Sequence, residues 1–161
     1  MKKSLIISVW LIFAFVIPVL SKDWLGIVPL HSTREDLERV IKAKLVRCGG
    51  NACLYDLADK TVFALYAAEP TCRNDDATTS WNVPANTVIE ITIHFKTPQP
   101  QSVLNIDLAK YERVEDKELR GLVYFYNYAD GIEIETSGDT IRRLTYFHAE
   151  KDSHLRCPKK P

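Results

Sequence analysis

A helical period of apolar residues marks one stretch of this chain, positions 27–45. The apolar residues of this stretch recur at the i, i+3, i+4 spacing of a single helix face: Leu37, Val40, Ile41 and Leu45. Charged residues fill the opposite face, as in an amphipathic helix that buries one stripe of side chains. The pattern therefore predicts a helix over 32–44 that packs on another layer of the protein.

Two residues mark the expected start of this helix. Ser32 is a favoured N-cap residue, and Glu35 follows three positions later, so the pair fits a capping box. Free amides at a helix N-terminus also attract anions, which makes Arg34 a candidate binding residue. The plainer interpretation is that Ser32 and Glu35 already occupy these amides and that Arg34 is simply exposed.

Most of the remaining chain has the period-two pattern of strands. Residues 87–95 alternate most cleanly, with Ile89, Ile91, Ile93 and Phe95 on one face. Strand-like runs separated by turn residues cover 53–57, 61–67, 87–95, 122–128, 132–136 and 140–148. The pattern predicts an α+β fold, with an antiparallel sheet of about six strands in two meanders and one main helix packed on a face.

The connection between the two meanders is harder to interpret. Residues 97–102 contain two prolines and two glutamines and are typical of a linker. Residues 103–116 fit either a strand or a helical turn, because their apolar residues satisfy both periods.

The two halves of the chain, 24–96 and 103–150, contain similar runs of residues. The matched runs are 55–62 with 126–133 and 87–94 with 140–147. An internal duplication of a helix and a three-stranded meander would explain this similarity. The alternative is chance, because short strand patterns often resemble one another.

The first 21 residues have the three parts of a secretory signal. Lys2 and Lys3 precede an apolar run over 5–20, and Ser21 ends a small-residue cleavage site. The run is shorter than the roughly 20 residues of a comfortable membrane span. We therefore expect a signal peptide over 1–21 and a single exported domain over 22–161, periplasmic or secreted, with no membrane span after cleavage. The alternative is an uncleaved N-terminal anchor.

The charge balance disfavours nucleic acid as a partner. Without Lys2 and Lys3, the chain has 19 basic and 21 acidic residues, a formal charge of −2. Nucleic-acid binding relies on clustered Lys and Arg that neutralise phosphates. A partner protein in the cell envelope or outside the cell is the better expectation.

The four cysteines are even in number, which favours two disulfides in an exported chain. They are Cys48, Cys53, Cys72 and Cys157. Zinc binding by the four thiolates fits poorly, because only the first two are close in sequence. A regular hairpin centred on Asp59 and Lys60 would place Cys72 opposite Cys48, but Pro70 would disturb that register. The pairing stays open.

The sequence shows no nucleophile with an adjacent base, and it predicts neither enzymatic activity nor a cofactor. The nearest approach to a metal site is the group His148, Asp152 and His154, which one loop could bring together for a metal-assisted hydrolase. The plainer interpretation is that His148 ends a strand and the other two lie in a solvated tail.

Aromatic residues are the best candidates for binding. Trp81 follows a long polar loop and is either an anchor for a partner or the residue that pins the loop to the sheet. Tyr124, Tyr126 and Tyr128 share one face of a strand, as a recognition surface or as a packed ladder. The leading hypothesis is a non-catalytic binding module. The alternative is a carrier of a small apolar or aromatic ligand in a cup between helix and sheet.

Three blocks of sequence carry a resemblance to a known family. Residues 26–38, 81–84 with 87–88, and 152–158 together resemble a family of small exported bacterial proteins of uncharacterised function. More distantly, a capped helix followed by a meander looks like the repeat of the β-lactamase inhibitory protein and of small outer-membrane assembly lipoproteins. Those repeats usually open with two short helices, and the lipoproteins carry an N-terminal cysteine that this chain lacks. The resemblance implies a binding role and transfers no site residue.

Overall fold

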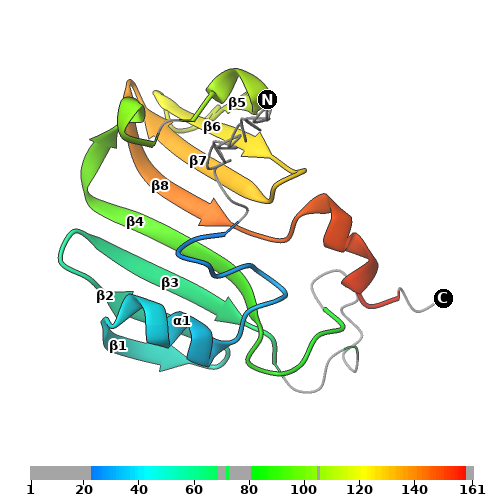
Figure 1. Ribbon diagram of the computed structural model, residues 1–161. Coiled ribbons are helices and arrows are strands. Elements are labelled where there is room, and N and C mark those ends of the chain that lie inside the picture. The colour runs from blue at the N-terminus through cyan, green and yellow to red at the C-terminus, as the bar shows by residue number, and fades with distance from the viewer. Residues whose placement is uncertain (1–22, 69–71, 73–80, 105, 159–161) are drawn as a thin grey trace, which may run out of the picture.

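One antiparallel sheet of eight strands dominates the computed structural model, which describes residues 23–68, 72, 81–104 and 106–158 (Figure 1). Its strand order is β1-β2-β3-β4-β8-β7-β6-β5. The strands are β1 (Lys44–Gly49), β2 (Ala52–Asp56), β3 (Lys60–Tyr66), β4 (Val88–Pro100), β5 (Glu112–Glu115), β6 (Leu122–Asn127), β7 (Ile132–Ser137) and β8 (Thr140–Tyr146). The predicted α+β class is confirmed, but the sheet has eight strands where the pattern indicated about six.

The sheet consists of two four-stranded meanders that meet where β4 pairs with β8. The strands that the pattern missed, β1 and β5, lie at the two edges, and every residue of both is exposed. A strand with no buried side shows no alternation of apolar and polar residues. β1 and β5 are strands because they pair with β2 and β6, and the residues of an edge strand alone do not show this pairing.

The connection between the meanders also differs from the prediction. Residues 97–102 do not form a linker, because β4 continues through this stretch to Pro100 and a short 3-10 helix, η1 (Gln101–Leu104), follows. A second turn, η2 (Leu108–Lys110), precedes β5. The stretch 103–116 therefore contains both helical turns and a strand, which were the two alternatives for it. The last short helix of the described chain is η3 (Glu150–Leu155).

The main helix, α1 (Arg34–Ile41), is shorter than the predicted range 32–44, and its N-cap lies one residue later than predicted. Thr33 is the N-cap, and its side chain accepts from the Asp36 amide while the Asp36 carboxylate accepts from the Thr33 amide. The Ser32 hydroxyl instead accepts from the Val28 amide. The predicted capping box of Ser32 and Glu35 is therefore wrong in its residues, because the same spacing occurs one position further on.

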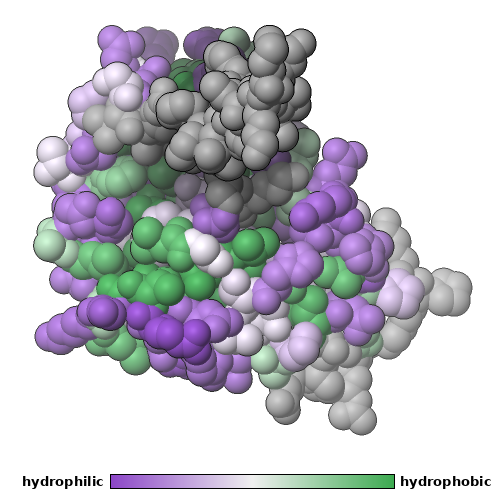
Figure 2. Space-filling model, viewed as in Figure 1, coloured by the Kyte–Doolittle hydropathy of each residue, from purple (hydrophilic) through white to green (hydrophobic). Residues whose placement is uncertain are grey.

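The helix ends early because Lys42 adopts a left-handed conformation with φ of 45°. Leu37 and Ile41 are buried, but Val40 is 38% exposed and Leu45 lies in β1. Two of the four residues of the predicted apolar face are therefore exposed rather than buried. The outer surface of α1 is hydrophilic, and hydrophobic residues gather above it over the middle of the sheet (Figure 2).

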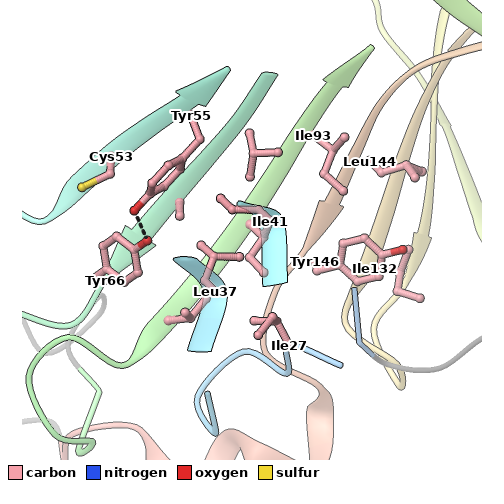
Figure 3. Packing of buried hydrophobic residues seen from close by; sticks show 14 of the residues in the cluster. Ile27, Leu37, Ile41, Cys53, Tyr55, Tyr66, Ile93, Ile132, Leu144 and Tyr146 are labelled. Carbon is pink, nitrogen blue, oxygen red and sulfur yellow. Dashed lines mark hydrogen bonds between the residues drawn. The ribbon is translucent and has the colours of Figure 1, made fainter. Parts of the chain in front are cut away.

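The core lies between α1 and one face of the sheet. Leu37 and Ile41 project from the helix toward side chains of β2, β3, β4, β7 and β8 (Figure 3). The sheet residues that are no more than 2% exposed include Tyr55, Val62, Ile91, Ile93, Ile132 and Ile134. Leu37 and Ile41 fill the space directly under the helix, and a hollow of about 280 Å³ lined by Ile93, Phe95, Leu144 and Tyr146 remains elsewhere on the sheet. None of the helices in the described ranges is long and apolar enough to span a bilayer.

Two tyrosines bring hydroxyl groups into this core. The hydroxyls of Tyr55 and Tyr66 are 2.8 Å apart, and Tyr55 also donates to the Glu38 carboxylate (2.9 Å). Burial raises the pKa of both tyrosines. The hydrogen bond from Tyr55 to Glu38 connects β2 to the helix. Both buried tyrosine hydroxyls therefore have hydrogen-bond partners.

The alignment of 55–62 with 126–133 matches residues that pair in the same way across their strands but lie on opposite faces of the sheet. Tyr55 is 2% exposed and pairs with the core residue Val62, whereas Tyr126 pairs with the half-buried Glu133. Tyr126 follows Phe125, which packs against the core, so its side chain points to the opposite face of the sheet. The matched tyrosines therefore lie on opposite faces, because a similarity of short runs does not fix which face is buried.

Both disulfides form, between Cys48 and Cys53 and between Cys72 and Cys157. The hairpin argument for pairing Cys48 with Cys72 is wrong, because β1 pairs with β2 and places Cys48 opposite Cys53. Disulfides persist in oxidising compartments. They support an exported protein, although residues 1–21 of the proposed signal lie outside the described residues.

Candidate functional site

Strand alternation places two tyrosines on the sheet face opposite α1. Tyr124 and Tyr126 of β6 are half-buried, and their neighbours across the strand pair are Glu135 and Glu133 of β7. Arg143 of β8 lies opposite Glu135 on the same face. We call these residues, Tyr124, Tyr126, Glu133, Glu135 and Arg143, the tyrosine face.

A row of aromatic rings continues from this face toward the C-terminal segment. The ring centroids are 6.3 Å apart for Tyr124 and Tyr126 and 5.5 Å for Tyr126 and Tyr128, both stacked. Phe147 lies 6.2 Å from Tyr128, and His148 follows at 5.7 Å and is 4.4 Å from Trp81. We call this series, Tyr124, Tyr126, Tyr128, Phe147, His148 and Trp81, the aromatic row.

The rings of the three tyrosines lie side by side. They stack as a ladder, and Tyr128 remains 52% exposed at the end of β6. Burial raises the pKa of Tyr124 and Tyr126, and the neighbouring Glu135 and Glu133 carboxylates raise it further. Both hydroxyls therefore stay protonated at neutral pH, where they can donate and accept hydrogen bonds.

Charged groups surround the tyrosine rings. Arg143 donates to Glu133 (2.9 Å) and contacts Glu135 (3.0 Å), and its guanidinium carbon is 5.9 Å from the Tyr124 ring centre. Its Nε is buried and has no hydrogen-bond partner. Glu133 and Glu135 therefore share one guanidinium, and the tyrosine face has a formal charge of −1.

Trp81 pins its segment to the C-terminal part of the chain. It is 7% exposed and packs with Leu30, Ala67 and Val83 in a second small core. Backbone pairing of Trp81 with Arg156 and the disulfide to Cys157 hold the two segments together. The anchoring interpretation of Trp81 would need an exposed ring, so the geometry favours pinning.

Arg156 and His148 cover the ring of Trp81. The Arg156 guanidinium carbon is 4.9 Å from the centre of the Trp81 ring, and its Nη2 donates to His148 Nε2 (3.1 Å). Burial lowers the pKa of His148, and the Arg156 charge lowers it further. A neutral imidazole with Nε2 as acceptor fits both observations.

A hollow of about 400 Å³ opens between the aromatic row and β4. Its aromatic walls are Trp81, Tyr126, Tyr128, Phe147 and His148. Glu90 of β4 and Glu133 of β7 supply carboxylates, and Arg156 lies at its rim. We call this hollow the Glu90 pocket. Sequence reasoning missed Glu90, Phe147 and Arg156, although Phe147 continues the aromatic pattern at the end of β8.

Arg34 does not belong to this site. It lies on α1, on the other face of the sheet, where its Nε donates to Glu38 (2.8 Å) and its guanidinium is 5.7 Å from the Tyr66 ring centre. The hydrogen bond from Arg34 lowers the pKa of Glu38. Its contacts are those of a helix side chain that braces β3.

The suspected metal ligands each have a different partner. His148 accepts from Arg156, the buried Asp152 pairs with His31 (3.1 Å), and His154 Nδ1 contacts the Lys151 carbonyl oxygen (2.8 Å). Over the described ranges no three His, Cys, Asp or Glu side chains gather as metal ligands would. His148, Asp152 and His154 do not come together.

Gly131 positions the aromatic row at the turn between β6 and β7. Its φ is +69°, and a Cβ there would collide with the carbonyl oxygen of Phe147. Gly131→Ala should therefore lower the free energy of unfolding by about 2–4 kcal/mol, from left-handed strain and overpacking together. Urea denaturation measures the loss.

Gly138→Ala is the matched control for this substitution. Gly138 has a similar φ of +57°, but a Cβ there meets no atom within 4 Å. We expect a loss of only about 1 kcal/mol, from backbone strain alone. Equal losses in the two variants would show that the contact with Phe147 carries no weight.

No protein-family model, curated protein or solved structure matches this chain. The chemistry of the tyrosine face and the Glu90 pocket is therefore the basis for assigning a function.

Proposed function

We propose that this chain is an exported, non-catalytic module that binds a protein partner through the tyrosine face. The observation that carries the proposal is the aromatic row, in which the rings of Tyr124, Tyr126 and Tyr128 stack and Phe147 meets Tyr128 edge-on. Tyrosine offers a large apolar area and a polar hydroxyl, and it is enriched in protein interfaces for that reason. A surface of this kind suits recognition of another protein.

The rigidity of the surface supports the same proposal. β6 pairs with a strand on each side, so the backbone under Tyr124 and Tyr126 is fixed. Rigid aromatic side chains lose little conformational entropy on binding, which leaves more of the contact energy for affinity. Glu133, Glu135 and Arg143 provide the polar groups that give an interface its specificity.

The order of elements is relevant to the resemblance to the β-lactamase inhibitory protein repeat. α1 precedes the meander β1 to β4, and η1 and η2 precede the meander β5 to β8. A helical segment followed by a meander therefore occurs twice, which is the arrangement on which that resemblance rests. Export is the part of the proposal that rests on the signal-like residues 1–21, and the two disulfides are consistent with it.

Site-specific photo-crosslinking in the native host tests the proposal. The photoreactive residue p-benzoylphenylalanine replaces Tyr124 on the tyrosine face or, as a control, Arg39, whose side chain is 73% exposed on α1. We expect irradiation to give a discrete adduct with one partner protein from position 124 and none from position 39. Adduct masses on a denaturing gel provide the readout.

Two outcomes would overturn the proposal. The same adduct from both positions would indicate indiscriminate contact, and the absence of any adduct from position 124 would indicate that the tyrosine face is not used. A Tyr126→Ala change beside the crosslinking residue should reduce the adduct yield at least about tenfold, because interface tyrosines are often hot spots.

A further inference from the structure

The Glu90 pocket combines aromatic walls with carboxylates. Tyr126, Tyr128 and Phe147 supply ring surface, and Glu90 and Glu133 supply the negative groups. Aromatic faces attract cations through the ring quadrupole, and carboxylates bind guanidinium groups through paired hydrogen bonds. A planar cation with several N–H donors can interact with both the aromatic rings and the carboxylates.

The charges around the pocket are unbalanced. Glu133 and Glu135 share Arg143, and Arg156 is engaged with Trp81 and His148. Glu90 accepts a hydrogen bond from the Thr92 hydroxyl (3.1 Å), and within the described part of the chain no basic side chain forms an ion pair with it. The three glutamates exceed the two arginines by one formal negative charge.

The chain itself stacks a guanidinium on one aromatic wall of this pocket. The guanidinium carbon of Arg156 is 4.9 Å from the centre of the Trp81 ring, and Arg156 donates to an imidazole nitrogen of His148; all three residues line the hollow. Tyr128, which also lines the hollow, is 52% exposed and stacks on Tyr126 with an angle of 3° between the rings. A second guanidinium could stack on the exposed side of Tyr128, as Arg156 stacks on Trp81.

We infer that the Glu90 pocket binds an arginine side chain presented by the protein partner. The inference rests on the proposed function and names the chemistry that the partner supplies. The guanidinium stacks on Tyr126, Tyr128 or Phe147 while its N–H groups donate to Glu90 and Glu133. Arginine fits better than lysine because its planar head uses the ring surface and the carboxylates together.

Titration of the purified, disulfide-bonded protein with N-acetyl-arginine methylamide tests the inference. Backbone amide shifts are followed by NMR, with the neutral isostere N-acetyl-citrulline methylamide as the matched ligand control. We expect saturable shifts at Glu90, Tyr126 and Tyr128, and binding of citrulline weaker by at least about fivefold, because it lacks the charge. Equal binding of the two ligands, or shifts elsewhere in the chain, would overturn the inference.

Two charge-matched variants separate the pocket from a general charge effect. Glu90→Gln should weaken arginine binding about three- to tenfold, the range for losing a partly exposed charged contact. Glu112→Gln removes a charge opposite Tyr126 but outside the pocket lining and should change binding less than about twofold. Equal effects of the two variants would count against a specific contact with Glu90.

A third titration, with spermidine, tests whether the pocket binds a free polyamine instead of an arginine side chain of a partner. Tighter binding of spermidine than of the arginine amide would assign the pocket to a polyamine and overturn the partner side chain. The crosslinking result is independent of these titrations. An adduct from position 124 without arginine binding would overturn only the inference, and arginine binding without an adduct would overturn only the proposed function.

Discussion

Replacing Cys72 and Cys157 together by alanine should lower the free energy of unfolding by about 4–5 kcal/mol. The Cys72–Cys157 disulfide joins residues 85 positions apart, so without it the unfolded chain gains the entropy of a long open loop. The bond also holds the segment of Trp81 against the segment of Arg156. Urea denaturation of the oxidised variant, with the other disulfide intact, measures the loss.

The other disulfide is a built-in control for loop length. Cys48 and Cys53 are only five positions apart in sequence, and they already face each other across the β1–β2 pair. Their double alanine variant should lose only about 2 kcal/mol in the same chain-entropy estimate. An equal or larger loss from the short loop would contradict the entropic account.

Replacing Leu37 by alanine should be the most damaging single substitution in the helix, with a loss of about 3–5 kcal/mol. Leu37 is 0% exposed and lies between α1 and the sheet, with Ile41 as the other buried residue of the helix (Figure 3). Truncation removes its apolar contacts and leaves a cavity that the paired strands below cannot close. Urea denaturation provides the free energy.

Val40→Ala is the control for this prediction. Val40 lies in the same helix but is 38% exposed, and alanine has a higher helix propensity than valine. Its loss should stay below about 1 kcal/mol. Similar losses for the two variants would mean that α1 contributes through its own helicity rather than through packing.

Local signals in the sequence were sufficient for much of the fold. The strict alternation at Ile91 and Ile93 predicted a half-buried strand, and Asp130 with Gly131 predicted the turn between β6 and β7. The capping pattern also predicted the helix, although Thr33 and Asp36 form the box that Ser32 and Glu35 were expected to form. Neighbouring residues with similar chemistry make such a pattern ambiguous by one position.

The candidate site was predicted only in part. Tyr124, Tyr126 and Tyr128 were identified because alternation within one strand puts them on one face. Glu90 and Arg156 carried no such signal, because they come from distant segments that meet at the Glu90 pocket. Arg34 was an attractive candidate on the helix, but it lies on the opposite face of the sheet from the tyrosines.

The sequence by itself determined the α+β class, most of the strands and the tendency of the cysteines to form disulfides, because each depends on residues close together in the chain. Only the tertiary structure decided the edge strands β1 and β5, the pairing of Cys48 with Cys53, and the face on which Tyr126 lies. These features depend on which strands become neighbours and in what register. A shift of one residue would move Tyr126 from the tyrosine face into the core.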